Sequence, residues 1–217
     1  MKRQTLLLLA LALFSLTSLT CLDTRPEFSY KVYGNIANYF ENEKDLLSFF
    51  EFKKGDVVAE IGALKGENIG GLALLTDSIT FYVQDINAKT LNQKNFNKVI
   101  RKCEKYKKPL TAKFNLCIGT EKSSNLPDAA FDKIVLSATF HEFTCMDEMV
   151  TDISKKLKPT GKLYILESHC FGKTHINYRV DETTAIMKKH NFHLVKKDGK
   201  DLNGGTGLYR AIYAKDN

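Results

Sequence analysis

The stretch VVAEIGALKG, residues 57–66, decides how this chain is interpreted. Its first five residues are apolar except for Glu60, and they predict a buried β-strand. Glycines at 62 and 66 bracket a short turn into the run ENIGGLALL, which predicts a helix. A strand, a glycine-containing turn and a helix are typical of the ligand-binding turn in a doubly wound sheet. Leu64 stands where such a turn could carry a further glycine.

Strand-like and helix-like segments alternate along the rest of the chain. At its end, FHLVKK and LYRAIYAK flank a turn rich in glycine, and this predicts an antiparallel hairpin. The predicted fold class is therefore α/β, with a doubly wound, mostly parallel, seven-stranded sheet. The five earlier strands are expected at 57–61, 78–85, 111–118, 131–137 and 162–167, and helices around 46–50, 67–75, 88–106, 146–157 and 181–190.

Length and composition favour one folded domain. A chain of 217 residues with 43% apolar residues suits a single α/β domain with a packed core. The net charge of +7 indicates a mildly basic surface, so we expect no nucleic-acid partner. The densest basic run, Lys98 to Lys108, could contact anionic lipid headgroups. Our expectation is that this run forms the solvated face of a helix.

The first twenty residues are typical of an export signal. A basic head, MKRQ, precedes the apolar run from Leu6 to Leu16, which is shorter than the ~20 residues that span a bilayer. Cys21 follows, as in a bacterial lipoprotein signal, although Ser18 stands where that pattern has an aliphatic residue. We expect residues 1–20 to be removed. The protein would then be exported, as a periplasmic protein or as a lipoprotein tethered through Cys21.

The other cysteines carry no recognisable pattern. None forms the C-x-x-C pair of a zinc or redox site, so no metal is predicted. In an exported protein they could form disulfides, but their spacing does not give a pairing. We expect each to be a small buried apolar residue. The four are Cys103, Cys117, Cys145 and Cys170.

An acidic residue ends the second expected strand. Asp85 lies nineteen residues after Gly66, where its carboxylate could accept hydrogen bonds from two ribose hydroxyls. The backbone N–H groups that open the helix after Gly66 could meet a carboxylate or a phosphate. A pair of glycines alone is weak evidence. Together with Glu60 and Asp85, the glycines indicate a nucleotide-like cofactor.

The chain resembles the class I S-adenosylmethionine-dependent methyltransferases over roughly residues 30–214. The likeness rests on four stretches and on the antiparallel last strand, which counts against an NAD-type Rossmann domain. It implies a Rossmann-like methyltransferase domain at 53–217, after a signal peptide at 1–20 and an N-terminal helical cap at 21–52. The stretches are VVAEIGALKG, FYVQDIN, LPDAAFDKIVLS and ISKKLKPTGKLYILE.

This resemblance also implies a cofactor, S-adenosylmethionine, and the residues that would hold it. Glu60, Gly62 and Gly66 would face its methionine half, and Asp85 would hold the ribose. Two departures concern the cofactor. Leu64 replaces the usual middle glycine, although some members have E-I-G-x-x-x-G there. The acid that commonly meets the adenine amino group is absent: Thr120 takes its place, and the neighbouring Glu121 could substitute for it.

One histidine is a candidate catalytic residue. The stretch SATFHEF resembles the segment after the fourth strand that often faces methyl donor and acceptor, and His141 could act there as a general base. The alternative is a surface or helix-capping histidine. A metal site from His141, Cys145, His169 and Cys170 has no recognised zinc spacing.

Three functions follow, in this order. The first is methyl transfer from S-adenosylmethionine to a small or surface-exposed acceptor, with no acceptor named by the sequence. The second is an exported protein on the same fold that binds a ligand without transferring methyl groups; Leu64 and the missing adenine acid favour it. A nicotinamide oxidoreductase is third.

Overall fold

The computed structural model describes residues 36–168, 180–199 and 208–216, and these form seven strands and six α-helices. The strands are β1 (Val57–Ile61), β2 (Thr80–Asp85), β3 (Lys113–Ile118), β4 (Phe131–Ser137), β5 (Leu157–Ser168), β6 (Phe192–Gly199) and β7 (Leu208–Lys215). The helices are α1 (Ile36–Glu41), α2 (Glu43–Phe50), α3 (Glu67–Leu75), α4 (Gln93–Glu104), α5 (Met146–Lys156) and α6 (Val180–Lys189), with a short 3-10 helix η2 (Phe140–Glu142).

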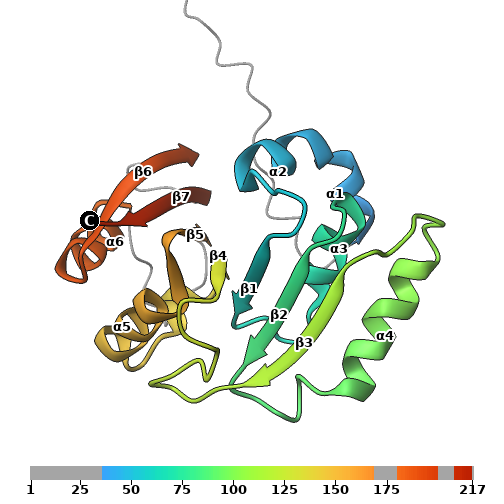
Figure 1. Ribbon diagram of the computed structural model, residues 1–217, viewed down its shortest axis with the longest axis horizontal. Coiled ribbons are helices and arrows are strands. Elements are labelled where there is room, and N and C mark those ends of the chain that lie inside the picture. Colours follow the sequence, from blue (N-terminus) through green and yellow to red (C-terminus); the bar gives the residue numbers. More distant parts are fainter. Residues whose placement is uncertain (1–35, 169–179, 200–207, 217) are drawn as a thin grey trace, which may run out of the picture.

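All seven strands join in one sheet, in the order β3-β2-β1-β4-β5-β7-β6 (Figure 1). Strands β1 to β5 pair in parallel, whereas β7 runs antiparallel to both of its neighbours, β5 and β6. The α/β fold class and the antiparallel C-terminal hairpin are confirmed. The order reverses between β1 and β4, and ligands bind at such a point, outside the carboxyl ends of the strands.

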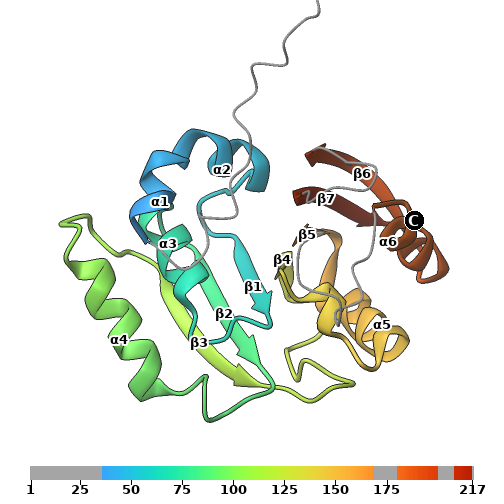
Figure 2. The same ribbon diagram turned by 180° about the vertical axis from the view of Figure 1, so that it is seen from behind.

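Alternating side chains of the strands build two apolar layers. On β1, Val58 faces the cluster that contains residues of α1 to α4, while Ala59 and Ile61 face the cluster of α5 and α6. The same alternation recurs on β5, where Tyr164 and Leu163 lie in opposite clusters. Burial on both faces explains why the central strands are nearly continuous apolar runs. Figures 1 and 2 show the helices arranged around the twisted sheet.

The N-terminal helices share the core of the sheet. Phe49 and Phe50 on α2 are buried and lie within ring-contact distance of Tyr164 on β5, at 5.7 and 5.6 Å between centroids. Arg210 on β7 forms two hydrogen bonds with Asp45 on α2, at 2.5 and 3.0 Å. These contacts fix the described part of the expected cap, residues 36–52, onto the sheet.

Most element boundaries lie within about three residues of the sequence expectations; α1 was not expected, and the starts of α4 and β5 differ most. The helix expected at 88–106 begins only at Gln93, because the Asn92 side chain caps it by accepting a hydrogen bond from the N–H of Asn95 at 3.0 Å. Strand β5 begins at Leu157, earlier than expected, through a bulge opposite Phe131 and Lys133. Neither difference moves the carboxyl end of a strand.

Several expectations fall outside the described residues. The export signal at 1–20, Cys21, His169 and Cys170 are all in this group. Within residues 36–168, 180–199 and 208–216, no helix is long and apolar enough to cross a membrane. In the same ranges Cys103 is buried, Cys117 and Cys145 are half-buried, and all three are free thiols.

The basic run 98–108 lies on and after α4. Its buried members, Val99 and Cys103, face the core, and most of its lysines are exposed. Lys102 pairs with Glu67 at 2.8 Å, and Lys108 pairs with Glu43 at 3.2 Å. This arrangement is that of a solvated helix face whose charges are partly paired with acids of neighbouring elements.

Candidate functional site

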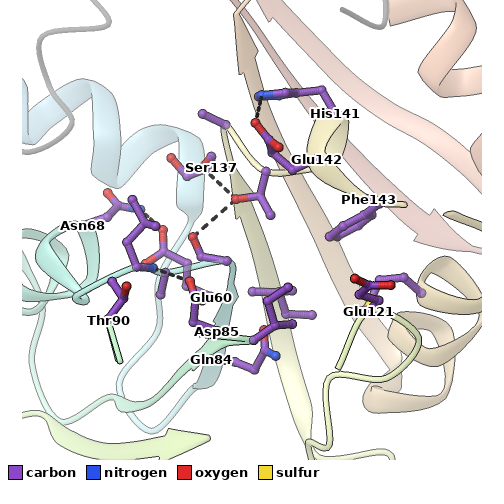
Figure 3. Close-up of a pocket in the computed structure, with 18 of the residues that line it drawn as sticks. Glu60, Asn68, Gln84, Asp85, Thr90, Glu121, Ser137, His141, Glu142 and Phe143 are labelled. Carbon is purple, nitrogen blue, oxygen red and sulfur yellow. Dashed lines mark hydrogen bonds and ion pairs between the residues drawn. The ribbon is translucent and has the colours of Figure 1, made fainter. Parts of the chain in front are cut away.

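A cavity of about 790 Å³ lies at the carboxyl ends of β1, β2 and β4, at the point where the strand order reverses (Figure 3). Its volume is within the range typical of sites for small molecules and cofactors. Five of the six residues that the sequence predicted for the site line this cavity: Glu60, Gly62, Asp85, Glu121 and His141. Gly66 does not belong to the lining.

The two predicted glycines are required by backbone conformation and by packing. Gly62 has φ +77°, and a Cβ there would lie 2.2 Å from the Thr139 side chain. Gly66 has φ +82°, and a Cβ there would lie 2.8 Å from the ring of Phe96 on α4. Only glycine adopts such φ values readily, and neither site has room for a side chain. Gly62 thus lets the segment after β4 approach the first turn, whereas Gly66 lets α4 pack behind it.

Leu64 takes the left-handed conformation that a middle glycine would take, with φ +51°. Its side chain is 66% exposed, and the residue lines the cavity. Its backbone N–H donates to Asp85 Oδ2 at 2.8 Å. The turn therefore keeps its shape with leucine in place of glycine, at the cost of a backbone conformation that L-residues rarely adopt.

Asp85 joins the turns that follow β1 and β2. Its side chain accepts from the Leu64 N–H through Oδ2 and from the Asn87 N–H through Oδ1, both at 2.8 Å. Asp85 is 5% exposed and lines the cavity. Each carboxylate oxygen has two lone pairs, so both oxygens can still accept a hydroxyl donor. The position therefore suits two neighbouring ribose hydroxyls, as the sequence predicted.

Glu60 is a buried acid with one unpartnered oxygen. Asn68 on α3 donates to Oε1 at 2.5 Å, and Tyr39 on α1 in turn donates to the Asn68 side chain. Oε2 is buried and has no partner within the described residues. Burial raises the pKa of Glu60 to about 7, against a lowering by the Asn68 hydrogen bond and with a further rise from the charge of Asp85. An orphaned buried carboxylate oxygen beside a cavity suits a cationic donor such as an ammonium group.

His141 lies at the edge of the cavity beside Glu142 (Figure 3), and Glu167 contacts its other ring nitrogen. Its Nδ1 is 2.7 Å from Glu167 Oε2, and its Nε2 is 3.1 Å from Glu142 Oε1. The hydrogen bond with Glu167 raises the pKa of His141, which outweighs the lowering by burial, and the charges of Glu167 and Glu142 raise it further. The imidazole side chain is only 5% exposed. It is therefore a positioned titratable group rather than a surface histidine.

Three polar residues that sequence reasoning missed shape the site. Asn68 holds Glu60, Thr139 packs on Gly62, and Glu167 holds His141. A signal for Asn68 existed, because it lies in the first turn of the helix after the glycines. Glu167 is the last letter of KLYILE, an acid at the end of a predicted strand, and could have been found on that ground.

Two further predictions concern adenine and metals. Glu121 and Thr120 line the cavity in the turn after β3, and both are exposed. Within the described ranges, no three His, Cys, Asp or Glu side chains are grouped as a metal site would require. Cys145 stands at the N-cap of α5, and the other two residues of the considered metal set, His169 and Cys170, are not described.

Part of the chain matches the model of a known protein family. The family model described as "Methyltransferase domain" matches residues 59–165, just under half of the chain. This range runs from β1 to β5 and contains the whole first turn, Asp85 and His141. A search of curated proteins finds no match.

Solved structures with the same fold include several methyltransferases. A SAM-dependent methyltransferase from Aquifex aeolicus is 18% identical, with a TM-score of 0.58 over 79% of this chain and 89% of that one. The phosphoethanolamine N-methyltransferase 2 of Haemonchus contortus, in complex with phosphomonomethylethanolamine and S-adenosylhomocysteine, is 11% identical with a TM-score of 0.60. The match covers 82% of this chain and 53% of that enzyme, so the chain spans about half of its length.

One similar structure has another activity in its name. The [4+2]-cyclase SpnF is 12% identical, with a TM-score of 0.58 over 81% of this chain and 80% of that one. At these identities the structural matches show the fold alone. The domain match and the Haemonchus enzyme, also solved with S-adenosyl-L-methionine, support the predicted cofactor. Residues 59–165 therefore match the methyltransferase domain model, and the described chain has the fold of these methyltransferase structures.

Proposed function

We propose that this protein transfers a methyl group from S-adenosylmethionine to a small or surface-exposed acceptor. The observation that carries the proposal is the placing of three groups around one cavity. Glu60 offers an orphaned buried oxygen, Asp85 offers two carboxylate oxygens with free lone pairs, and His141 stands beside Glu142 on the same lining. The first two suit the cofactor, and the third suits an acceptor.

The residues present fit the cofactor in its two polar parts. Glu60 would hold the ammonium group of the methionine half, because its Oε2 has no other partner in the described chain. Asp85 would hold the ribose hydroxyls, and Glu121 would approach the adenine amino group. Leu64 and Ile86 are 66% and 53% exposed on the cavity lining and offer apolar surface to the base. The cofactor supplies an electrophilic methyl group.

His141 would receive the proton that a hydroxyl or amine acceptor loses. Its Nε2 is the ring nitrogen next to the exposed Glu142, whereas Nδ1 is occupied by Glu167. A base with a pKa near neutrality is suited to this task. The Thr139 hydroxyl donates to the Ser137 carbonyl at 3.0 Å, and the Thr139 side chain packs against Gly62 of the first turn.

Calorimetry with S-adenosylmethionine and S-adenosylhomocysteine tests the proposal directly. We expect both compounds to bind the chain that begins at residue 21. With S-adenosylmethionine alone as the methyl donor, we expect a compound from a panel of amines and alcohols to be methylated and S-adenosylhomocysteine to be formed. No affinity at millimolar cofactor, on the order of −4 kcal/mol or weaker, would contradict the proposal.

A second candidate is a protein of the same fold that binds a ligand without transferring methyl groups. Leu64 favours it, because an exposed leucine stands on the cavity lining where the first turn of this fold commonly has a glycine. The cyclase among the similar structures is a protein of this fold whose name gives another reaction. Cofactor binding with no S-adenosylhomocysteine formed from any acceptor would favour this candidate.

We further propose that the protein is exported and tethered through Cys21. This rests on the basic head, the apolar run and the cysteine of the sequence alone. S-adenosylmethionine is made in the cytoplasm, so an exported domain would meet its cofactor only outside the usual compartment. Localisation therefore bears on whether the enzyme or the binding protein is the natural function.

A further inference from the structure

Glu167 is the more buried of the two described acids that contact the candidate base. It lies near the end of β5, and its side chain is 3% exposed. Oε1 accepts a hydrogen bond from the Phe140 N–H at 2.7 Å, and Oε2 is 2.7 Å from His141 Nδ1. One carboxylate thus meets two donors on consecutive residues after β4. It orients both the backbone of η2 and the plane of the imidazole ring.

Glu142 differs from Glu167 in its exposure. Its side chain is 57% exposed, and it meets His141 Nε2 at the longer distance of 3.1 Å. Because more than half of the Glu142 side chain is in contact with solvent, its carboxylate can gain water when it turns away from the ring. A carboxylate as buried as Glu167 cannot do so, because the charge would lose its partners without gaining water.

We propose that Glu167 is the positioning residue of His141: it keeps the ring proton on Nδ1, and Nε2 becomes the proton acceptor when Glu142 moves aside. The inference rests on the proposed function, since it assigns the base of that reaction. Neither the sequence resemblance nor the domain match assigns a role to Glu167 or to Glu142.

The proton balance follows from this geometry. The acceptor's X–H bond breaks, its electron pair takes the methyl group, and its proton goes to Nε2 of a neutral ring. The ring becomes an imidazolium, and Glu167 stabilises that charge through Nδ1. Both carboxylates can accept hydrogen bonds from the ring together only when the ring is an imidazolium, so in this proposal Nε2 accepts a proton only after Glu142 has turned away.

Other charged groups face the same cavity as the ring. From the turns after β1 and β3 come Lys65 and Glu121, and from the strands come Glu60 and Asp85. Among the described residues, the charged groups in contact with the ring are Glu167 from β5 and Glu142 from η2. Variants of these two acids therefore distinguish the role of the buried partner, Glu167, from that of the exposed partner, Glu142.

Nitrogen-15 NMR of the histidine rings tests the assignment without any acceptor or cofactor. The His141 signal is identified by its loss in a His141→Asn variant. In the unchanged protein we expect neutral His141 to carry its proton on Nδ1. Glu167→Gln should abolish that preference and lower the pKa of His141 by about one unit, a tenfold loss of proton affinity. Glu167→Asp, which keeps the carboxylate, should retain the Nδ1–H form.

Glu142→Gln should lower the pKa of His141 and still leave the proton on Nδ1. A matched control is Glu148→Gln, because this acid is 49% exposed on α5 and pairs with Lys122 away from the cavity. The control should change neither the pKa nor the tautomer.

Two results would overturn the inference. The first is an unchanged tautomer and pKa in folded Glu167→Gln. The second is a switch to Nε2–H in Glu142→Gln, which decides the question even where Glu167→Gln fails to fold. Calorimetry with S-adenosylhomocysteine on the same samples reports separately on the proposed function, since the tautomer is measured with no cofactor present.

Discussion

Leu64 adopts a backbone conformation that is unfavourable for a leucine. Its φ of +51° is that of a glycine, and its N–H is fixed by Asp85. The Leu64 side chain is mostly solvent-exposed, so it does not have to pack inside the protein and does not distort the turn. The residue therefore keeps the shape of the ligand-binding turn with an apolar side chain at its surface.

Leu64→Gly should raise the free energy of unfolding by roughly 1 kcal/mol, because the left-handed conformation costs glycine nothing. Cofactor affinity should stay unchanged or fall, since the turn becomes looser. Denaturant unfolding and calorimetry measure the two effects. A tenfold gain in affinity, about 1.4 kcal/mol, would show instead that leucine obstructs the site.

Asp85→Ala should weaken cofactor binding at least several-fold. The ribose hydroxyls would lose their acceptor, and the N–H groups of Leu64 and Asn87 would lose theirs, at roughly 1–3 kcal/mol for each buried group. Calorimetry with S-adenosylhomocysteine measures the change. Asp147→Asn, an exposed acid on α5, is the control and should bind as the unchanged protein does. Equal affinity in both variants would contradict the ribose assignment.

The raised pKa of Glu60, about 7 against an ordinary 4.5, predicts two pH effects. The folded state holds the proton more tightly than the unfolded state, so this group's stabilisation is complete below about pH 4.5. It is lost as the pH rises to about 7. Cofactor binding needs the carboxylate, so affinity should rise through the same pKa.

Glu60→Gln tests both effects. The variant should lack this component of the pH dependence of unfolding and should show weak cofactor binding at every pH. Urea unfolding and calorimetry between about pH 5 and about pH 8 provide the comparison. A pH-dependent affinity that survives in Glu60→Gln would assign the titration to another group.

At the scale of elements, the attachment of α2 to β7 fixes the N-terminal helices. Arg210 is 4% exposed, and its guanidinium lies 4.5 Å from the ring centroid of Phe49 while it pairs with Asp45. Tyr39 on α1 then reaches Asn68 and, through it, Glu60. The N-terminal helices are thus connected to the cofactor side of the cavity.

Asp45→Asn should lower the free energy of unfolding by about 2 kcal/mol, because a buried guanidinium loses its charged bidentate partner while Asp45 itself is partly exposed. Glu43→Gln on the same helix is the control. It removes an exposed pair with Lys108 and should cost less than about 1 kcal/mol. If urea unfolding gave the same loss of free energy for both variants, the Asp45–Arg210 pair would contribute no more to stability than the exposed pair.

At the scale of the whole molecule, the export proposal predicts a shorter mature protein. Residues 1–20 should be removed, leaving Cys21 as the N-terminus, with a lipid if the tether forms. Intact-mass analysis of protein from the membrane fraction should show this shortened chain. Full-length protein recovered from the cytosol would contradict the export proposal. The protein and S-adenosylmethionine would then be in the same compartment.

The local pattern of the sequence was enough to predict the elements. Short, nearly continuous apolar runs placed β1 and β4 at their observed bounds, and the glycine-rich turn predicted the pairing of β6 with β7. These are interactions between near neighbours in the chain, so their signals lie in short windows. For the same reason the acid and glycines of the first turn, and Asp85, could be assigned to one site from their spacing in the chain.

What only the tertiary structure decided are the partners of those residues. Thr139 meets Gly62 across 77 positions of sequence, and Glu167 meets His141 across 26. No local pattern encodes such contacts, because they arise when the ends of β1, β4 and β5 lie side by side in the sheet. The sequence by itself determined the fold class, the first turn and the type of cofactor. The tertiary structure assigned Gly66 to packing against Phe96, and it placed His141 between two carboxylates whose unequal burial gives them unequal roles.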